Sequence, residues 1–271
     1  MNGEIVWLGR YPVKSMLGED LAEAVLDESG IVGDRRCALV DRETGLVASA
    51  KYPWKWRPLL TMAARCGPDG VVVTLPDGTA VAEDDPSFDD VLSRALGRPV
   101  HLAHSRKPDA QLERLATELD ESPGELTRGT LAEATPGDTF VDYGPLHVLT
   151  TATLDALSRE HPHRTVAAAR FRPNVIVRMT DEEPFVENGW PDRVLSVGSE
   201  AILRVVKQTA RCVVPTLAQG RELADDPDVL RTAARLNRVD VPDRGMRTCV
   251  GAYASVERAG PLRVGDLVTL T

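Results

Sequence analysis

The sequence predicts an α+β fold that is mostly β, with a β-barrel-like architecture and a few helices. Many short runs of apolar and β-branched residues are separated by turns rich in glycine and proline. Only a few stretches show the apolar spacing of an amphipathic helix. The chain has 271 residues, of which 42% are hydrophobic and 27% are charged. It is therefore long enough to bury a core and has an ordinary globular composition.

The first part of the chain contains strand patterns that are separated by turns. A strand is predicted for "EIVWLGRYPV", a strand–turn–strand unit for "AVLDESGIVGDRRCALVD", and a hairpin that turns at Asp77-Gly78 for "GVVVTLPDGTAV". A short helix is predicted for "DDPSFDDVLSRALG", because acidic residues open it and Gly97 follows it. We expect residues 1–103 to form one domain. Residues 104–145 are polar, acidic and rich in proline and glycine, which is typical of a connecting segment.

The remaining residues, 146–271, are expected to form a second domain. A strand leads into a helix through Thr150-Thr151 in "LHVLTTATLDALSREHP", and a second strand follows Pro-Asn in "RFRPNVIVRM". The stretch "RVLSVGSEAILRVVKQTARCVVPTL" predicts a hairpin that turns at Gly198 and places Cys212 beyond its second strand. An amphipathic helix in "DPDVLRTAARLNR" and strands around a Gly-Pro turn in "VGAYASVERAGPLRVGDLVTLT" complete the pattern.

Composition and charge argue against several classes of partner. The net charge of -9 disfavours a broad surface for nucleic acid or for an anionic membrane. No apolar run has the length that spans a bilayer. The first residues, "MNGEIVWLGRYPVKSM", contain neither a charged leader nor an extended apolar segment, so we expect no signal peptide and a cytoplasmic location.

The four cysteines are scattered, without a C-x-x-C motif. This spacing argues against disulfides, a zinc ribbon and an iron–sulfur cluster, so a redox reaction would take its electrons from another protein. Cys212 directly follows Arg211 at a predicted strand end, and a neighbouring cation favours the thiolate form of cysteine. We interpret Cys212 as a candidate reactive or metal-binding thiolate, and Cys37 and Cys66 as small core residues. His101, His104, His161 and His163 are expected to be surface or structural residues.

Basic and hydroxyl residues stand where predicted strands end. In "YPVKSM", Lys14 and Ser15 follow a proline that prevents regular ladder pairing, which suits a loop over a ligand. In "GDRRC", alternation sends only one of Arg35 and Arg36 toward a pocket. Because the chain as a whole is acidic, a local basic pocket of this kind is what an anionic ligand requires.

Two further stretches have the same character. In "RFRPN", an extended segment would place Arg170, Arg172 and Asn174 on one face, which suits the recognition of phosphate; an exposed polar face is the alternative. In "LTTATLDAL", Thr150 and Thr151 precede a helix, where capping of the helix and binding of an anion are compatible.

These stretches, together with "VASAKYP", "ARCVVPT", "VGAYASV" and "VGDLVTL" in this order, resemble the MOSC family. The resemblance covers nearly the whole chain. It implies a MOSC N-terminal β-barrel domain, then a connecting segment, then a MOSC β-barrel-like domain. The family is named for the C-terminal domain of the molybdenum cofactor sulfurase. It includes the mitochondrial amidoxime-reducing component and bacterial proteins that confer resistance to N-hydroxylated purines.

The resemblance implies a molybdopterin-type cofactor whose molybdenum is bound by Cys212, the catalytic residue. Such a cofactor is a pterin dithiolene with a terminal phosphate, so its site needs cations, hydrogen-bond donors and a soft thiolate. The match to the family favours Arg35 over Arg36 as a ligand of the cofactor. The cofactor-binding residues implied by the resemblance are Lys14, Ser15, Arg35, Thr150, Thr151, Arg170, Arg172, Asn174 and Arg211.

The function that follows is an oxidoreductase that reduces N-oxygenated (N-hydroxylated) substrates with electrons from a separate flavin or iron–sulfur protein. Direct use of NADH is not expected, because no G-x-G-x-x-G turn is present. One alternative is a cofactor carrier or sulfur-transfer module that uses a Cys212 persulfide, and another is a basic pocket for a different phosphorylated ligand. Family members are also associated with pyridoxal phosphate, but no desulfurase domain that binds it is recognisable here. The chain departs from the family pattern at Thr209-Ala210 and at Ala218-Gln219.

Overall fold

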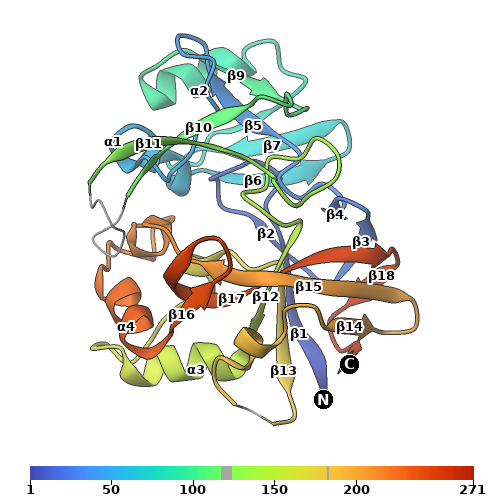
Figure 1. Cartoon of the computed structure of the whole chain (residues 1–271). Helices are drawn as coiled ribbons and strands as arrows, with labels where there is room; N and C mark the ends of the chain where they lie inside the picture. Colours follow the sequence, from blue (N-terminus) through green and yellow to red (C-terminus); the bar gives the residue numbers. More distant parts are fainter. Residues whose placement is uncertain (117–123, 182) are drawn as a thin grey trace.

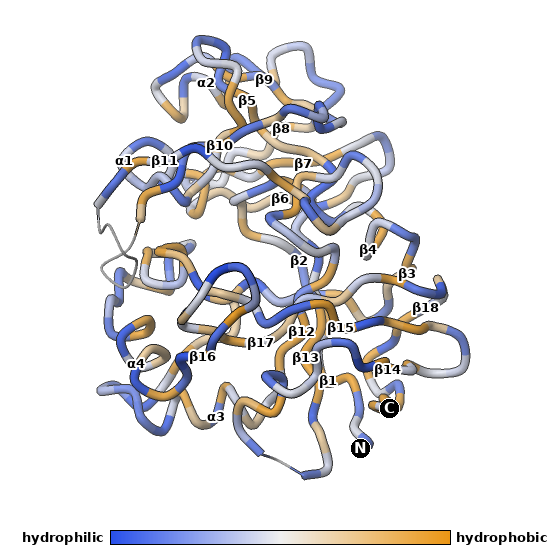
Figure 2. The backbone as a smooth tube through the Cα atoms, in the orientation of Figure 1, coloured by the Kyte–Doolittle hydropathy of each residue, from blue (hydrophilic) through white to orange (hydrophobic). Residues whose placement is uncertain are grey.

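The computed structural model describes residues 1–116, 124–181 and 183–271, and it confirms a mostly β fold with a few helices. Figure 1 shows two bodies, one above the other. The upper body contains strands β5 to β11 with helices α1 and α2, and the lower body is built on one large sheet. Figure 2 shows hydrophobic residues concentrated along the strands and hydrophilic residues along many of the loops.

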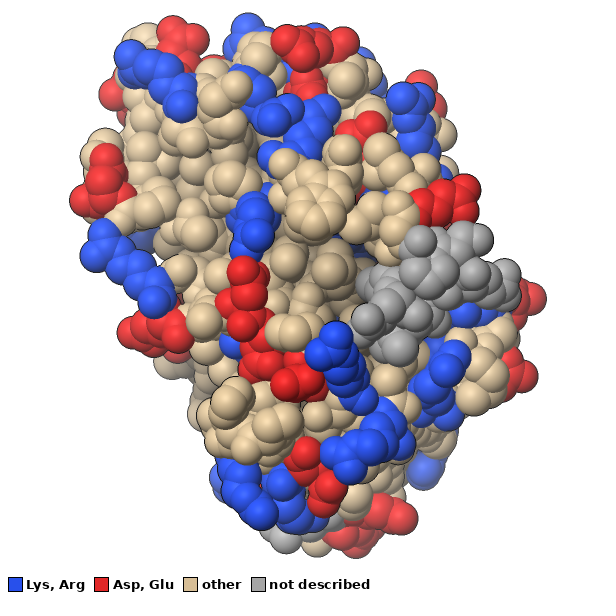
Figure 3. All heavy atoms as spheres, turned by 90° about the vertical axis from the view of Figure 1, so that its left-hand side faces the viewer, with Lys and Arg blue, Asp and Glu red and all other residues tan. Residues whose placement is uncertain are grey.

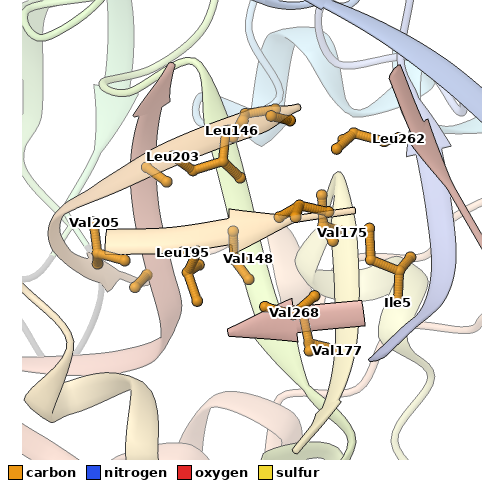
Figure 4. Packing of buried hydrophobic residues seen from close by; sticks show 14 of the residues in the cluster. Ile5, Leu146, Val148, Val175, Val177, Leu195, Leu203, Val205, Leu262 and Val268 are labelled. Atoms are coloured by element: carbon orange, nitrogen blue, oxygen red, sulfur yellow. The ribbon is translucent and has the colours of Figure 1, made fainter. Parts of the chain in front are cut away.

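The large sheet of the lower body closes into a seven-stranded barrel. Its strands follow the order β12-β13-β1-β19-β14-β15-β17, and β17 pairs again with β12. Side chains such as Ile5, Val148 and Val268 alternate toward the barrel interior and pack there (Figure 4). The barrel strands are β1 (Asn2–Arg10), β12 (Leu146–Thr150), β13 (Val175–Met179), β14 (Val194–Val197), β15 (Ala201–Ala210), β17 (Gly245–Arg258) and β19 (Leu267–Leu270).

The barrel takes strand β1 from the start of the chain. This strand pairs with β13 on one side and with β19 on the other, both antiparallel. The first residues of the expected domain 1–103 therefore complete the sheet formed by residues 146–271. The three-part division into 1–103, 104–145 and 146–271 stays a prediction from sequence. Further pairs join β2 (Glu19–Leu21) to β1, β16 (Arg238–Val241) to β17, and β3 (Glu23–Asp27) to both β4 (Gly30–Ile31) and β18 (Pro261–Arg263).

The upper body has its own core, in which Met16, Leu39, Trp56 and Leu92 are buried. Its helix α2 ends where the sequence predicts, because Gly97 adopts a left-handed conformation (φ 67°) that closes the last turn. The elements are β5 (Ala38–Asp41), α1 (Pro53–Trp56), η1 (Arg57–Thr61), β6 (Ala63–Gly67), β7 (Gly70–Thr74), β8 (Ala80–Ala82), α2 (Phe88–Leu96) and β9 (Val100–Ala103).

The expected connecting segment forms structure of its own. Strands β10 (Gln111–Leu115) and β11 (Leu126–Thr130) pair as a hairpin, and Leu112 and Phe140 are buried against Val47. The described residues of this segment therefore pack with the upper body, and its last residues run down toward the barrel.

Two helices cover the barrel on one side. Helices α3 (Thr151–Glu160) and α4 (Asp228–Leu236) bury Leu157 and Val229 against strand residues Leu149 and Val250. Within the described part of the chain, no helix has the length and apolar character needed to cross a membrane. Three short 3-10 helices complete the fold: η2 (Ala168–Phe171), η3 (Val186–Gly189) and η4 (Val214–Thr216).

Candidate functional site

Two adjoining cavities lie where the upper body meets the barrel. The first cavity collects seven of the sequence-predicted site residues, three from the upper body and four from the barrel side. The second cavity shares five lining residues with the first, including Cys212, so this thiol lies at their boundary. The seven predicted residues in the first cavity are Lys14, Ser15, Arg35, Arg172, Asn174, Arg211 and Cys212.

Three of these residues hold an uncommon backbone conformation. Ser15 (φ 65°), Arg35 (φ 45°) and Arg172 (φ 54°) are left-handed, which residues with a Cβ rarely adopt. Backbone hydrogen bonds fix these turns; the Arg35 amide donates to the Tyr11 carbonyl at 2.7 Å, and the Arg172 amide donates to Ala169 at 3.0 Å. Strained positions of this kind are concentrated at ligand sites, and here all three face one cavity.

A buried lysine forms one wall of the first cavity. The Lys14 ammonium lies 2.6 Å from Asp142 Oδ1 and donates to the Phe140 carbonyl oxygen at 2.8 Å, and Lys51 contacts the same carboxylate at 3.1 Å. Burial lowers the pKa of Lys14 to about 8, although Asp142 opposes this shift. Burial works to raise the pKa of Asp142, but the two ammonium groups together hold it well below its usual range. One carboxylate thus serves two cations.

A second wall is formed by two arginines and an asparagine. Arg35 Nη1 donates to Asp34 Oδ2 at 2.5 Å and to Asn174 Oδ1 at 3.1 Å, so the charge of Arg35 is balanced. Arg172 Nη1 donates to the Met16 carbonyl oxygen at 2.6 Å, whereas its Nη2 is buried without a hydrogen-bond partner. Burial, together with the neighbouring Arg35, lowers the pKa of Arg172 to about 10, so it is still a cation at neutral pH. A buried cation with an unused donor favours an anionic ligand.

Cys212 follows directly after the end of β15. Its neighbour Arg211 donates through Nη2 to the Phe171 carbonyl oxygen at 3.0 Å, while the Arg211 Nε is buried and has no partner. The Cys212 thiol is free and half-buried. Thr209 Oγ1, two residues before Arg211, is also buried without a partner and lines the same cavity. This side of the cavity therefore offers a thiol beside a cation and two unused polar atoms.

Thr150 and Thr151 do not reach either cavity. Thr150 is fully buried and caps helix α3, because its Oγ1 accepts from the Thr153 amide at 3.2 Å. The carboxyl group of Glu187 accepts from the Thr150 amide at 2.8 Å, and burial raises its pKa. Thr151 lines a separate surface hollow with Asp155 and Arg159. Of the two compatible interpretations of "LTTATLDAL", the structure contains the cap.

Arg170 also lies outside both cavities, and the expectation of one extended face is wrong. Residues 168–171 form the 3-10 helix η2 and Arg172 is left-handed, so the side chains of Arg170 and Arg172 diverge. Arg170 donates to the carbonyl oxygens of Pro215 (3.2 Å), Leu217 (3.2 Å) and Ala224 (2.8 Å). It therefore supports the loop that follows Cys212.

Several lining residues were not identified from the sequence. Lys51, Asp142, His147 and Tyr253 all line the first cavity. Lys51 stands in the motif "VASAKYP", which was a signal for the family but not for a role. Asp142 lies in the expected connecting segment, so only the fold brings it to Lys14. Burial, with the nearby Arg211, lowers the pKa of His147 to about 3, so this imidazole is neutral.

A separate cluster of ligand-type residues lies in the upper body. The Cys37 Sγ is 3.4 Å from His104 Nδ1, and the His104 Nε2 is 3.0 Å from Glu83 Oε1. The two ring nitrogens thus face different partners, which is the geometry of a hydrogen-bond chain and not of one metal centre. Burial raises the pKa of the Cys37 thiol to about 12, so it stays protonated. None of these three residues lines either cavity.

Comparison with protein families agrees with this architecture. The MOSC domain matches residues 137–269, and the MOSC N-terminal beta barrel domain matches residues 2–99. The chain therefore belongs to the MOSC family, as the sequence motifs predict.

Several individual proteins are similar to this chain in sequence. The chain is similar to mitochondrial amidoxime reducing component 2 from Rattus norvegicus, with 24% identity over 286 residues that cover 97% of this chain and 81% of the relative. The Macaca fascicularis protein of the same name is 25% identical over 98% of this chain and 83% of the relative. The Homo sapiens protein is 31% identical over 132 residues, which are 48% of this chain and 38% of the relative.

Among solved structures, the YUAD protein from Bacillus subtilis aligns over 100% of this chain and 96% of that chain. The TM-score is 0.46 and the identity is 14%. YiiM from Geobacillus stearothermophilus aligns over 47% of this chain and 54% of that chain, with a TM-score of 0.34 and 15% identity.

Proposed function

We propose that this protein is a molybdenum cofactor-dependent reductase of N-oxygenated substrates that takes electrons from a separate donor protein. One observation carries the proposal: the free thiol of Cys212 shares a cavity with cations whose buried donors are unused, Arg172 Nη2 and Arg211 Nε. The similarity to proteins named for amidoxime reduction supports the same class of reaction.

The residues of the first cavity fit a molybdopterin-type cofactor. Its phosphate requires cations and N–H donors, and the buried Lys14 and the half-buried Arg172 supply both. Its metal requires a soft ligand in an open position, and Cys212 is the cysteine that lines the cavity. When bound, such a cofactor supplies a metal centre that exchanges two electrons and an oxygen atom with a substrate. The residues that would hold it are Lys14, Ser15, Arg35, Arg172, Asn174, Arg211 and Cys212.

The overall reaction sets what else the site must provide. Reduction of an N–OH group to N–H breaks the N–O bond, consumes two electrons and two protons, and releases water. His147 is not a source of these protons at neutral pH, because its pKa of about 3 keeps it neutral. The ammonium of Lys51 holds its proton, because Asp142 raises its pKa although burial opposes this. Lys51 lines both cavities beside Cys212 and stays a cation there.

The test begins with metal analysis of protein produced in a host that makes the cofactor. Stoichiometric molybdenum supports the proposal, and its absence would favour a pocket for a different phosphorylated ligand. Loaded protein is then assayed for reduction of a hydroxylamine with reduced viologen dye as the electron source. Molybdenum without any turnover would point instead to a carrier or sulfur-transfer module that uses a Cys212 persulfide.

The need for a partner is tested in the same assay. NADH alone should give no turnover, whereas NADH with a reductase and a flavin or iron–sulfur carrier should. Redox partners of this kind dock through small, weak interfaces, so no stable complex is expected on a sizing column. Turnover with NADH alone would overturn the claim of a separate donor.

A further inference from the structure

The second cavity provides a different approach to the same thiol. It shares Lys51, Asp142, Arg211, Cys212 and Tyr253 with the first cavity. The rest of its wall comes from the β10–β11 hairpin, the end of β15, the region of the β16–β17 turn, and Glu133 and Tyr143 between β11 and β12. Since the first cavity is the proposed cofactor site, the second cavity is the space from which a substrate meets the group that Cys212 holds.

The lining of the second cavity is strongly basic, although the chain carries a net charge of -9. On the face of the molecule shown in Figure 3, by contrast, basic and acidic side chains are interspersed. Both acids of the cavity are already paired: Asp142 with Lys14 and Lys51, and Glu133 Oε2 with Arg244 Nη2 at 3.2 Å. The basic residues that line the cavity are Lys51, Arg114, Lys207, Arg211, Arg244 and Arg247, and the acidic ones are Glu133 and Asp142.

Besides Arg211, three of these cations have no carboxylate partner within the described ranges: Arg114, Lys207 and Arg247. Lys207 Nζ donates only to the Pro242 carbonyl oxygen at 3.1 Å, and Arg247 Nη1 donates to Met246 at 3.0 Å. All three side chains are half-buried, where an unpaired charge is less well solvated than at an open surface. Guanidinium groups with free N–H donors match carboxylate and phosphate oxygens in geometry.

The same cavity has an aromatic wall. The rings of Tyr143 and Tyr253 lie 5.5 Å apart with a 44° angle between their planes. Lys207 lies 5.2 Å from the centroid of the Tyr143 ring, which joins the aromatic wall to the basic one. The two rings pack against each other, and an aromatic ligand can pack on this wall because aromatic rings attract one another in offset and edge-to-face arrangements.

From these features, and on the basis of the proposed function, we propose that the second cavity selects N-hydroxylated aromatic substrates that carry a carboxylate or phosphate group. The N–OH end lies toward Cys212, the ring lies along Tyr143 and Tyr253, and the anionic group is bound by Arg114 and Arg247. Lys207 strengthens the positive field between them.

The experiment compares three substrates with the loaded protein and reduced viologen dye: N-phenylhydroxylamine, its para-carboxylate and its para-phosphate. We expect a KM about tenfold lower for at least one anionic compound, because a charge-assisted contact is worth about one decade in affinity. This preference should shrink as ionic strength rises. The carboxylate and phosphate arms identify which anion the cavity takes.

Two variants and two matched controls locate the effect. Arg114→Gln and Arg247→Gln should raise the KM of the anionic compounds more than the KM of N-phenylhydroxylamine, and so remove the preference. Arg128→Gln and Arg238→Gln remove exposed cations from the neighbouring strands β11 and β16. Neither Arg128 nor Arg238 lines a cavity, so both variants should preserve the preference.

The outcomes separate this inference from the proposed function. No turnover of any of the three substrates overturns the proposed reductase. Turnover of all three with equal KM keeps the reductase and overturns the anionic preference. Loss of molybdenum in Arg114→Gln or Arg247→Gln assigns these cations to the cofactor and also overturns the inference.

Discussion

Arg170 and Arg172 lie two residues apart, but the buried Arg170 and the half-buried Arg172 have opposite surroundings. Around Arg170, three backbone carbonyls accept hydrogen bonds and the guanidinium ties the loop after Cys212 to η2. Around Arg172, one carbonyl accepts, Nη2 has no partner, and the largest effect of a neighbouring charge on the Arg172 pKa comes from the like-charged Arg35. A buried cation whose donors are used is part of the scaffold, whereas a cation with a buried, unused donor favours a ligand.

The largest expected effect is at Cys212, which lines the cavity of Arg172 and precedes the loop that Arg170 holds. Cys212→Ser should keep the fold and abolish molybdenum binding or activity, because serine is nearly isosteric but is a harder ligand that stays protonated. Metal analysis and the viologen assay measure this, and circular dichroism checks the fold. Cys66→Ser is the matched control, since Cys66 is also free and half-buried but lines neither cavity. Full activity with normal metal content in Cys212→Ser would remove this residue from the site.

The second effect concerns Arg172, whose Nη2 has no hydrogen-bond partner. Arg172→Met should weaken cofactor binding by about ten- to a hundredfold, since one charge-assisted contact is lost. The same change should cost the cofactor-free protein less stability than Arg170→Met does, because it relieves the repulsion from Arg35 and removes one hydrogen bond, to the Met16 carbonyl oxygen. Cofactor content and chemical denaturation measure the two effects.

Two further variants serve as references for Arg172→Met. Lys14→Met should lower cofactor content in the same way, because Lys14 is buried in the same cavity. Arg36→Ala should change little, because Arg36 is 56% exposed and its partner Asp138 is also at the surface. Equal losses at Arg36 and Arg172 would show that the cofactor lies on a different face.

The contrast between these arginines also shows how far the sequence could lead. Alternating apolar residues predict strands such as β15, and Gly97 predicts the end of α2, because both signals act over a few residues. The divergence of Arg170 and Arg172 depends on the 3-10 turn of η2 and on one left-handed residue. Apolar periodicity does not encode such a turn.

Contacts between residues far apart in the sequence could not be predicted, for a different reason. Strand β1 completes a barrel whose other strands all come from residues beyond 145, and no local pattern reveals this partner. Likewise, Lys14 and Asp142 are far apart in the sequence and meet only through the fold. The predicted motifs named seven of the residues in the first cavity, but the carboxylate that connects Lys14 to Lys51 could be found only in the structure.

The third effect concerns Arg170, which donates to three backbone carbonyl oxygens. Arg170→Met should destabilise the protein by about 2–4 kcal/mol, because three carbonyl oxygens lose their donor. Denaturant unfolding measures this loss, and Arg178→Met, at an exposed barrel position, should cost less than about 0.5 kcal/mol. If Arg170→Met lowered cofactor affinity with no loss of stability, Arg170 would belong to the site and the comparison would fail.

The smallest effect is a pH dependence that originates at Lys14. Burial lowers the pKa of Lys14 in the folded protein to about 8, against an ordinary value of 10.5 for the unfolded chain. Between these two values the unfolded chain holds the proton and the folded chain does not, so stability from this group rises with pH through this window. Cofactor binding should change in the opposite direction, weakening several-fold above about pH 8 as Lys14 loses its charge.

The Lys14→Met variant shows how much of the pH dependence of stability and of cofactor binding comes from Lys14 and how much from other titrating groups. The difference in unfolding free energy between the cofactor-free native protein and Lys14→Met should be constant below about pH 8 and should then shift in favour of the native protein up to about pH 10.5. Cofactor retention of Lys14→Met should be low and flat over the same range. Parallel stability curves for the two proteins would mean that Lys14 keeps its ordinary pKa, and that its wall of the cavity is better solvated than its 5% exposure indicates.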